Sequence, residues 1–239
     1  MFHGTICLLY VNSVVALQRF MNGKAVEGET KAMFDQIKYV HNLALSAVSF
    51  YMGAVQLYLI IMDGRFTSFH SMACQNTTNS GWYGHANFLY LVSKIWEWGD
   101  TYFLILYGKP VIPLHSFHHM TTFTMAALTH NFPVGGFAFI NCAVHTVMYL
   151  HYAQPQLWAR PFITTFQLLQ FVCVVTIHTY GYLTPSDECF DFSAVGMEWW
   201  YCQIVVVLYF FMFCKFFSDN YIFKKDKANE GKKEKKKLE

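Results

Sequence analysis

Charged residues are scarce in this sequence: aspartate, glutamate, lysine and arginine make up 13% of its 239 residues. Soluble domains usually carry about 25% charged residues. The chain also has only six prolines and 14 glycines, and no stretch rich in proline, glycine or serine that would separate two domains. These shortages argue against a soluble protein and against several domains. We expect one membrane-embedded domain over residues 1–222, followed by a basic tail over 223–239.

Hydrophobic residues account for 54% of the sequence and aromatic residues for 19%. A helix needs roughly 20 apolar residues to cross a bilayer, and helices satisfy their own backbone hydrogen bonds there. The apolar stretches predict an all-α polytopic membrane protein with seven transmembrane helices, the first of them short. No basic residue precedes the first stretch, which therefore does not resemble a cleaved signal peptide. We place the helices at about 4–18, 38–62, 86–107, 115–131, 134–153, 162–183 and 198–218.

Basic residues are distributed unevenly along the chain. They gather between the first two predicted spans, and nine of the 17 lie from Lys215 onward, whereas the loops at about 63–85 and 184–197 contain only Arg65. The positive-inside rule then places the C-terminus in the cytosol and the N-terminus on the other side. A basic tail can bind nucleic acid, but beside a membrane we interpret it as a solvated anchor and expect no nucleic-acid partner.

Five of the seven cysteines fall within predicted spans, where we expect them to be free and to pack as small apolar residues. Cys74 and Cys189 instead lie in the two loops assigned to the non-cytosolic side. An oxidising compartment there would allow a Cys74–Cys189 disulfide. The sequon at Asn76 makes this residue a candidate glycan acceptor, although nearness to the membrane could block the modification.

Three histidines stand in the otherwise apolar run PLHSFHHMTTF. His115, His118 and His119 have the spacing i, i+3, i+4, so on a helix they share one face. Titratable groups at membrane depth are costly and tend to be functional. The alternative is that the three rings only hydrogen-bond to neighbouring helices.

Three further predicted spans carry polar residues at helical spacing. These residues are Lys94, Glu97, Asp100 and Thr101 in the third span, Asn141, His145, Met148, Tyr149 and Tyr152 in the fifth, and Thr164, Gln167 and Gln170 in the sixth. Each stripe alone is compatible with packing, or with a paired network that only holds the bundle together. Because four consecutive spans each turn a polar face inward, we predict a bundle around a polar, histidine-lined cavity.

These four patterns, in this order, resemble the motifs of the ELO family of very-long-chain fatty acid elongases. The family motifs K-x-x-E-x-x-D-T, H-x-x-H-H, N-x-x-x-H-x-x-M-Y-x-Y-Y and T-x-x-Q-x-x-Q match residues 94–101, 115–119, 141–152 and 164–170. The resemblance covers about residues 30–225. One departure is visible, because His151 stands where the family has the penultimate tyrosine of its third motif. This change bears on the pocket more than on the reaction.

The resemblance implies a seven-helix, multi-pass protein of the endoplasmic reticulum membrane, in contact with membrane lipid. The implied reaction condenses a long-chain acyl-CoA with malonyl-CoA to give 3-oxoacyl-CoA, CO2 and CoA, with no metal or other cofactor. The last four residues, KKLE, resemble a dilysine retrieval signal for that compartment. The family also implies reductase and dehydratase partners in an elongation cycle. An oligomer is compatible with the sequence, and the preferred acyl chain length and unsaturation stay open.

The chemistry of imidazole agrees with this reaction, because a neutral imidazole can attack a thioester and form an acyl-imidazole. We predict His118 as the nucleophile. His145 and Asn141 would stabilise oxyanion or enolate charge. His115 and His119 would orient the ring or shuttle a proton. The rival mechanism uses a histidine as general base without a covalent intermediate. A supporting polar network would comprise Lys94, Glu97, Asp100, Thr101, Tyr149, Tyr152, Gln167 and Gln170.

Lys38, Lys109 and Arg160 lie near the predicted cytosolic mouth and are candidates to bind the phosphates of CoA, unless they are only positive-inside anchors. A membrane di-iron desaturase or hydroxylase is the competing enzyme class. It would need about eight histidine ligands, more than one box with His145 and His151 supplies. A channel, carrier or receptor would explain buried polar groups but not four motifs in register.

Overall fold

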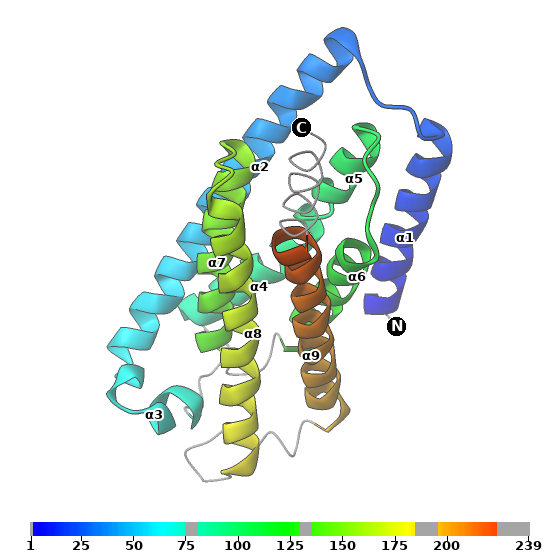
Figure 1. The fold of residues 1–239 in the computed structure, drawn as a ribbon. Helices are drawn as coiled ribbons and strands as arrows, with labels where there is room; N and C mark the ends of the chain where they lie inside the picture. The colour runs from blue at the N-terminus through cyan, green and yellow to red at the C-terminus, as the bar shows by residue number, and fades with distance from the viewer. Residues whose placement is uncertain (1, 75–80, 130–134, 185–195, 224–239) are drawn as a thin grey trace, which may run out of the picture.

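The computed structural model describes residues 2–74, 81–129, 135–184 and 196–223 (Figure 1). Its regular elements in these ranges are all helical, which confirms the all-α prediction. A 3-10 turn at Arg65–Thr67 precedes α3, and a π-turn at Ser218–Ile222 follows α9. The α-helices are α1 (Phe2–Met21), α2 (Gly28–Met62), α3 (Phe69–Cys74), α4 (Gly81–Trp96), α5 (Gly99–Leu106), α6 (Pro113–Leu128), α7 (Gly135–Ala153), α8 (Ala159–Leu183) and α9 (Met197–Phe217).

Four helices of the described ranges are long and apolar enough to cross a bilayer: Gly4–Met21, Gly28–Met62, Ala159–Leu183 and Met197–Ile222. The chain is therefore a multi-pass membrane protein, as predicted. The remaining predicted spans are α6, α7 and the pair α4 and α5, so the count of seven crossings stays a prediction. α2 is longer than expected, because it begins at Gly28 rather than near residue 38 and extends to 35 residues.

Six helices close a ring. Going around it, α2 packs against α7, α7 against α8, α8 against α9, α9 against α6, α6 against α4, and α4 against α2. α1 lies outside this ring against α5 and α6, at the right of Figure 1. Below, the basic end denotes the end of the bundle at Lys31, Lys38 and Lys109, and the far end denotes the opposite one, at Met62 and Leu183.

The tightest seam of the ring joins α2 to α7. A Cβ added at Gly53 of α2 would lie 3.3 Å from the Cβ of Cys142 on α7, so the missing side chain permits the close approach. The hydroxyl of Ser46 donates a hydrogen bond to the carbonyl of Thr146 at 2.9 Å. Small residues at such seams stabilise membrane bundles, because lipid-embedded helices associate through close packing and polar contacts.

The third predicted span is not one continuous helix. α4 ends at Trp96 and α5 begins at Gly99, and over residues 98–101 the backbone forms tighter i to i−3 hydrogen bonds. A Cβ at Gly99 would lie 2.6 Å from Cε1 of His41, so the ring of His41 on α2 fills the space beside the break. The prediction of a single helix over 86–107 is therefore wrong at Glu97 and Trp98. Gly99 follows these two residues, and the neighbouring helices α2 and α7 supply polar partners there.

The cysteine predictions divide into two groups. The five cysteines of the predicted spans, Cys7, Cys142, Cys173, Cys202 and Cys214, are free, as expected. Cys189, Asn76, the side chain of Cys74 and the tail over 224–239 lie outside the described residues. The disulfide and the glycan acceptor therefore stay predictions.

Gln56 on α2 yields a prediction about stability. Its side chain is fully buried, and neither its amide nitrogen nor its amide oxygen has a hydrogen-bond partner among the described residues. An unpaired buried polar group costs about 1–3 kcal/mol, so Gln56→Leu, which keeps the volume, should raise the free energy of unfolding by about that amount. Thermal unfolding of the purified protein in detergent measures the change.

Asn141→Leu is the matched control for this substitution, because the amide of Asn141 is fully engaged by neighbouring helices. Its unfolding temperature should fall while that of Gln56→Leu rises. A Gln56→Leu variant that melts below the wild type would contradict the prediction.

Candidate active site

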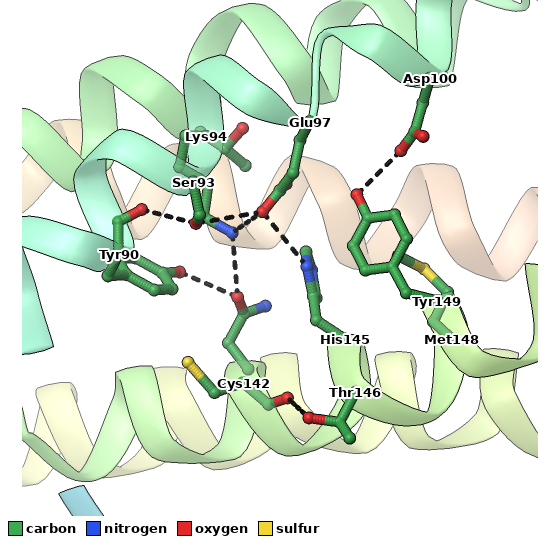
Figure 2. A network of polar contacts seen from close by, with 12 residues as sticks. Tyr90, Ser93, Lys94, Glu97, Asp100, Cys142, His145, Thr146, Met148 and Tyr149 are labelled. Atoms are coloured by element: carbon green, nitrogen blue, oxygen red, sulfur yellow. Dashed lines mark hydrogen bonds and ion pairs between the residues drawn. The ribbon is translucent and has the colours of Figure 1, made fainter. Parts of the chain in front are cut away.

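A buried carboxylate sits between α4 and α7. Oε1 of Glu97 lies 2.8 Å from Nζ of Lys94 and 3.4 Å from Nδ1 of His145, and all three side chains are almost completely buried (Figure 2). Nζ of Lys94 also donates to Oδ1 of Asn141 at 3.3 Å. Because an isolated ion in an apolar interior costs several kcal/mol, the cation and the anion depend on each other. We call Lys94, Glu97, Asn141 and His145 the carboxylate network.

Further groups hold the carboxylate network in place. The Tyr90 hydroxyl donates to Oδ1 of Asn141 at 2.9 Å, and Nδ2 of Asn141 donates to Oε1 of Gln170 on α8 at 3.2 Å. The ammonium of Lys94 lies 4.4 Å from the centre of the Tyr90 ring, a favourable cation–π position. These hydrogen bonds link the predicted polar faces of three spans. Asn141 takes part with both the oxygen and the nitrogen of its side-chain amide.

The contact with Glu97 determines which ring nitrogen of His145 carries a proton. An ionised carboxylate can only accept hydrogen bonds, so the Nδ1 that faces it carries a proton. Nε2 is then the nitrogen that can exchange a proton with another group. A nearby carboxylate also stabilises the ring when it becomes positively charged, as in other histidine sites held by an acid.

The histidine box, which comprises His115, His118 and His119, opens α6. Pro113 occupies the first turn of this helix, where its missing N–H leaves no hydrogen bond unmade. Nε2 of His115 lies 3.0 Å from the Thr101 hydroxyl of α5, and the rings of His115 and His119 are 4.4 Å apart. The box is therefore attached to the third predicted span through Thr101.

His118 is the least constrained ring of the box. It is half-buried, 5.2 Å from the ring of Tyr209 on α9, and neither of its ring nitrogens is hydrogen-bonded to a described residue. It lies within electrostatic range of Glu97 and His145. The box and the carboxylate network thus lie within electrostatic range of each other, and both His118 and His119 have a ring nitrogen without a hydrogen-bond partner among the described residues.

Asp100 belongs to a separate cluster. Its Oδ1 lies 3.2 Å from Nε2 of His41 on α2, and its Oδ2 accepts a hydrogen bond from the Tyr149 hydroxyl at 2.8 Å. The expectation that Asp100 supports the site is compatible with this geometry, but its histidine partner is His41 and not a member of the box. Figure 2 shows Asp100 and Tyr149 beside the carboxylate network.

Other predicted site residues lie further from this centre. Tyr152 is 45% exposed, because it follows the other residues of its stripe near the end of α7. Nε2 of Gln167 donates to the sulfur of Met148 at 3.4 Å. Lys109 and Arg160 are exposed, and Lys38 is half-buried. His151 accepts a hydrogen bond from the backbone N–H of Gln156 at 3.1 Å, beyond the end of α7.

Three residues that contact the site were missed from the sequence, together with the buried Asn42 that follows one of them in the chain. Tyr10 lies 2.9 Å from the Thr101 hydroxyl, Tyr90 binds the amide of Asn141, and His41 and Asn42 enter from α2. The adjacent His41 and Asn42 were a usable signal, since two strongly polar residues interrupt an otherwise apolar span. The two tyrosines gave none, because tyrosine is common in apolar spans.

Several buried polar atoms of the site have no hydrogen-bond partner among the described residues. They are Oε2 of Glu97, Nδ1 of His119 and both side-chain polar atoms of Asn42. Most buried polar atoms in native proteins are paired. Of these atoms, a protonated Nδ1 of His119 can donate a hydrogen bond to a substrate oxygen such as that of a thioester carbonyl, whereas the carboxylate oxygen of Glu97 can only accept.

Comparison with known proteins agrees with this site. Residues 1–229 match the family model described as ELO: GNS1/SUR4 family. The chain is 32% identical over 206 residues to "Long chain fatty acid elongase 2" of Caenorhabditis elegans, covering 79% of this chain and 72% of that protein. "Very long chain fatty acid elongase 6" of Rattus norvegicus is 30% identical over 191 residues, or 75% of this chain and 69% of its own length.

A third relative matches over more of its length. "Fatty acid elongase sre1" of Dictyostelium discoideum is 28% identical over 239 residues, which cover 95% of this chain and 84% of that protein. The family model, the four motifs in register and the polar interior of the bundle lead to one conclusion: the chain belongs to the ELO family and is a membrane enzyme of fatty acid elongation.

Proposed function

We propose that the protein is a 3-oxoacyl-CoA synthase, which condenses a long-chain acyl-CoA with malonyl-CoA and releases CO2 and CoA. The observation that supports this reaction best is the buried Lys94–Glu97–His145 contact, which lies within electrostatic range of the histidine box in a membrane bundle. Thioester chemistry needs a nucleophile or base of near-neutral pKa, and imidazole supplies either. No metal takes part in this proposal.

In the first half of the reaction, a ring nitrogen of His118 attacks the thioester carbonyl. A C–N bond forms, the C–S bond breaks, and CoA leaves as the thiolate. The absence of a hydrogen-bond partner on either ring nitrogen, within the described residues, favours His118 over His115, whose Nε2 is engaged by Thr101. His119 lies beside both rings and orients them.

In the second half, malonyl-CoA loses CO2 and the resulting enolate attacks the acyl carbonyl. A C–C bond forms, the C–N bond to His118 breaks, and the imidazole is restored. His145 stabilises the enolate when its ring is protonated, because Glu97 offsets the positive charge at 3.4 Å. Asn141 holds Lys94 and so contributes by fixing the network more than by touching the substrate.

The basic end is the site assigned to CoA. Nζ of Lys38 and Nζ of Lys31 lie 5.3 Å and 5.7 Å from the centre of the Tyr107 ring, and Lys109 is within electrostatic range of Lys38. Arg160 is the exposed basic residue at the start of α8. This cluster of cations favours a polyanion, and it lies at the end of the bundle that the positive-inside rule places in the cytosol.

We assign the protein to the endoplasmic reticulum membrane, with a cytosolic C-terminus, because the elongation substrates are CoA esters that approach from the cytosol. A reductase and a dehydratase would complete the elongation cycle there. Transfer of radiolabel from malonyl-CoA to a 3-oxoacyl-CoA, with activity retained in EDTA, tests the reaction. A requirement for iron and oxygen would instead support the desaturase class.

His118→Ala should lower kcat by at least about 10³-fold, because removal of a covalent nucleophile usually has effects of this size. Ser116→Ala, in the same helical turn, is the matched control and should keep the wild-type rate. Incubation with acyl-CoA alone should add one acyl group to the wild-type mass and none to the His118→Ala mass. Normal turnover by His118→Ala would refute the assignment, and turnover without a wild-type adduct would favour the general-base mechanism.

Single and double variants of the Lys94–Glu97 pair distinguish its contribution to stability from its contribution to catalysis. Lys94→Met should destabilise the fold by about 3–5 kcal/mol, because Glu97 is left as an uncompensated buried charge. Adding Glu97→Gln should recover much of this stability without restoring activity, because His145 has then lost its carboxylate. The unfolding temperature and the condensation rate of each variant are measured on the same preparation. Wild-type activity in the double variant would leave the pair with a packing role only.

Lys38→Ala should raise KM for acyl-CoA severalfold with little change in kcat, since a partly exposed contact with a phosphate contributes about 1 kcal/mol. The effect should shrink as the salt concentration rises, because salt screens exposed charges. Lys24→Ala, in the exposed loop before α2, is the control for net charge. Equal effects of the two substitutions would indicate that Lys38 acts through the net positive charge of the protein and not through a direct contact with CoA.

A further inference from the structure

The condensation proposed above consumes one proton, and this inference rests on that reaction. The malonyl carboxylate leaves as neutral CO2, while CoA leaves as a thiolate that must become a thiol. Neither substrate carries the proton for this sulfur. A proton must therefore reach a site whose central residues, Glu97, His145 and Tyr149, are almost completely buried.

We propose that His41, Asp100 and Tyr149 deliver this proton from the basic end to the departing CoA. The three side chains form a continuous hydrogen-bonded chain across α2, α5 and α7. Hereafter they are called the proton chain. None of the four family motifs contains His41, and the carboxylate network does not include Asp100.

The direction of the chain follows from the donors at its outer end. The indole Nε1 of Trp96 donates to Nδ1 of His41 at 3.1 Å, and an indole N–H cannot accept. Nδ1 of His41 is therefore the acceptor, and the ring proton sits on Nε2. This nitrogen lies 3.2 Å from Oδ1 of Asp100, so the proton of His41 is directed inward.

The inner end of the chain lies beside His145 of the carboxylate network. The Tyr149 hydroxyl donates to Oδ2 of Asp100 at 2.8 Å, and the Tyr149 ring lies 5.7 Å from the ring of His145. The side chains of His41 and Asp100 keep a small exposed fraction, 9% and 13%, whereas Tyr149 is fully buried. Lys38, one helical turn nearer to the basic end, lies within electrostatic range of Asp100.

A second polar chain in the structure does not have this open end. His115 contacts Thr101, and Thr101 contacts Tyr10, but Tyr10 is only 2% exposed and belongs to α1, outside the ring. That chain anchors the histidine box to α1. The proton chain instead connects the carboxylate network with the basic end.

The transfer leaves each group as it began. Tyr149 gives its hydroxyl proton to the sulfur as the C–S bond breaks, and its oxygen regains a proton from Asp100. Asp100 passes on the Nε2 proton of His41, and water supplies a proton to Nδ1, beside the 41%-exposed Trp96. Exchange with water then returns the ring to its starting tautomer, so one proton has moved inward from solvent.

The fold holds His41 in one position. Phe103 packs edge-on against its ring, with the centroids 5.2 Å apart, and the Cβ of an alanine at position 99 would lie 2.6 Å from Cε1 of His41. Gly99→Ala therefore displaces the ring without removing any titratable group. This substitution gives a second, independent way to interrupt the chain.

The test is chemical rescue of His41→Ala in the full-length protein. Its kcat should fall about tenfold, with KM for acyl-CoA unchanged, and should rise with the concentration of imidazole in the buffer at constant pH and ionic strength. The kcat of Tyr149→Phe should fall by about 10²-fold or more, because proton transfer by a positioned side chain contributes that much to the rate. Imidazole should not restore the kcat of this variant. Gly99→Ala should resemble His41→Ala.

The outcomes separate this inference from the reaction on which it rests. Failure of the wild type to form a 3-oxoacyl-CoA from labelled malonyl-CoA would refute the proposed function itself. A His41→Ala variant with wild-type kcat, or with a loss that imidazole does not reduce, would overturn the proton chain while leaving the condensation intact. Thermal unfolding of each variant, with His41→Gln as a conservative replacement, shows whether a loss of rate reflects a loss of fold.

Discussion

The contact between Lys94, Glu97 and His145 is the constraint on which the rest of the interior depends. A carboxylate and an ammonium, both almost fully buried in a membrane bundle, can persist there only because they lie 2.8 Å apart and share further partners. Those partners come from α4, α7 and α8, so satisfying one ion pair fixes three helices relative to one another. The same contact sets the tautomer of His145 and so links stability to chemistry.

The break between α4 and α5 follows from the same requirement. Glu97 reaches toward α7, whereas Asp100, three positions further along the chain, reaches toward both α2 and α7. The tighter turn over residues 98–101 accommodates both directions, and Gly99 leaves room for the ring of His41. Irregular backbone at membrane depth is tolerated where it is buried in protein, and here it lies inside the ring of helices. One broken span therefore serves two polar clusters.

Much of the site could be predicted because its spacing lies within single helices. The i, i+3, i+4 pattern of the histidine box and the i, i+3 pair of Lys94 and Glu97 are local, and the structure keeps both. Contacts between helices could not be predicted in this way. Asp100 was expected to belong to a supporting polar network, but its pairing with His41 depends on the rotation of α2, and periodicity carries no information about that rotation. Tyr152 is 45% exposed for a related reason, since a helical face continues past the buried part of the bundle.

The separation of the two carboxylates has a chemical consequence. Glu97 is neutralised by Lys94 and holds His145, whereas Asp100 has no described lysine or arginine in direct contact and is paired with a neutral ring and a phenol. The first arrangement keeps a charge in place, and the second allows a proton to pass, because a carboxylate between two neutral donors can accept and release a proton without breaking an ion pair. Two acids three residues apart thus differ in their partners, and the broken helix between them makes that difference.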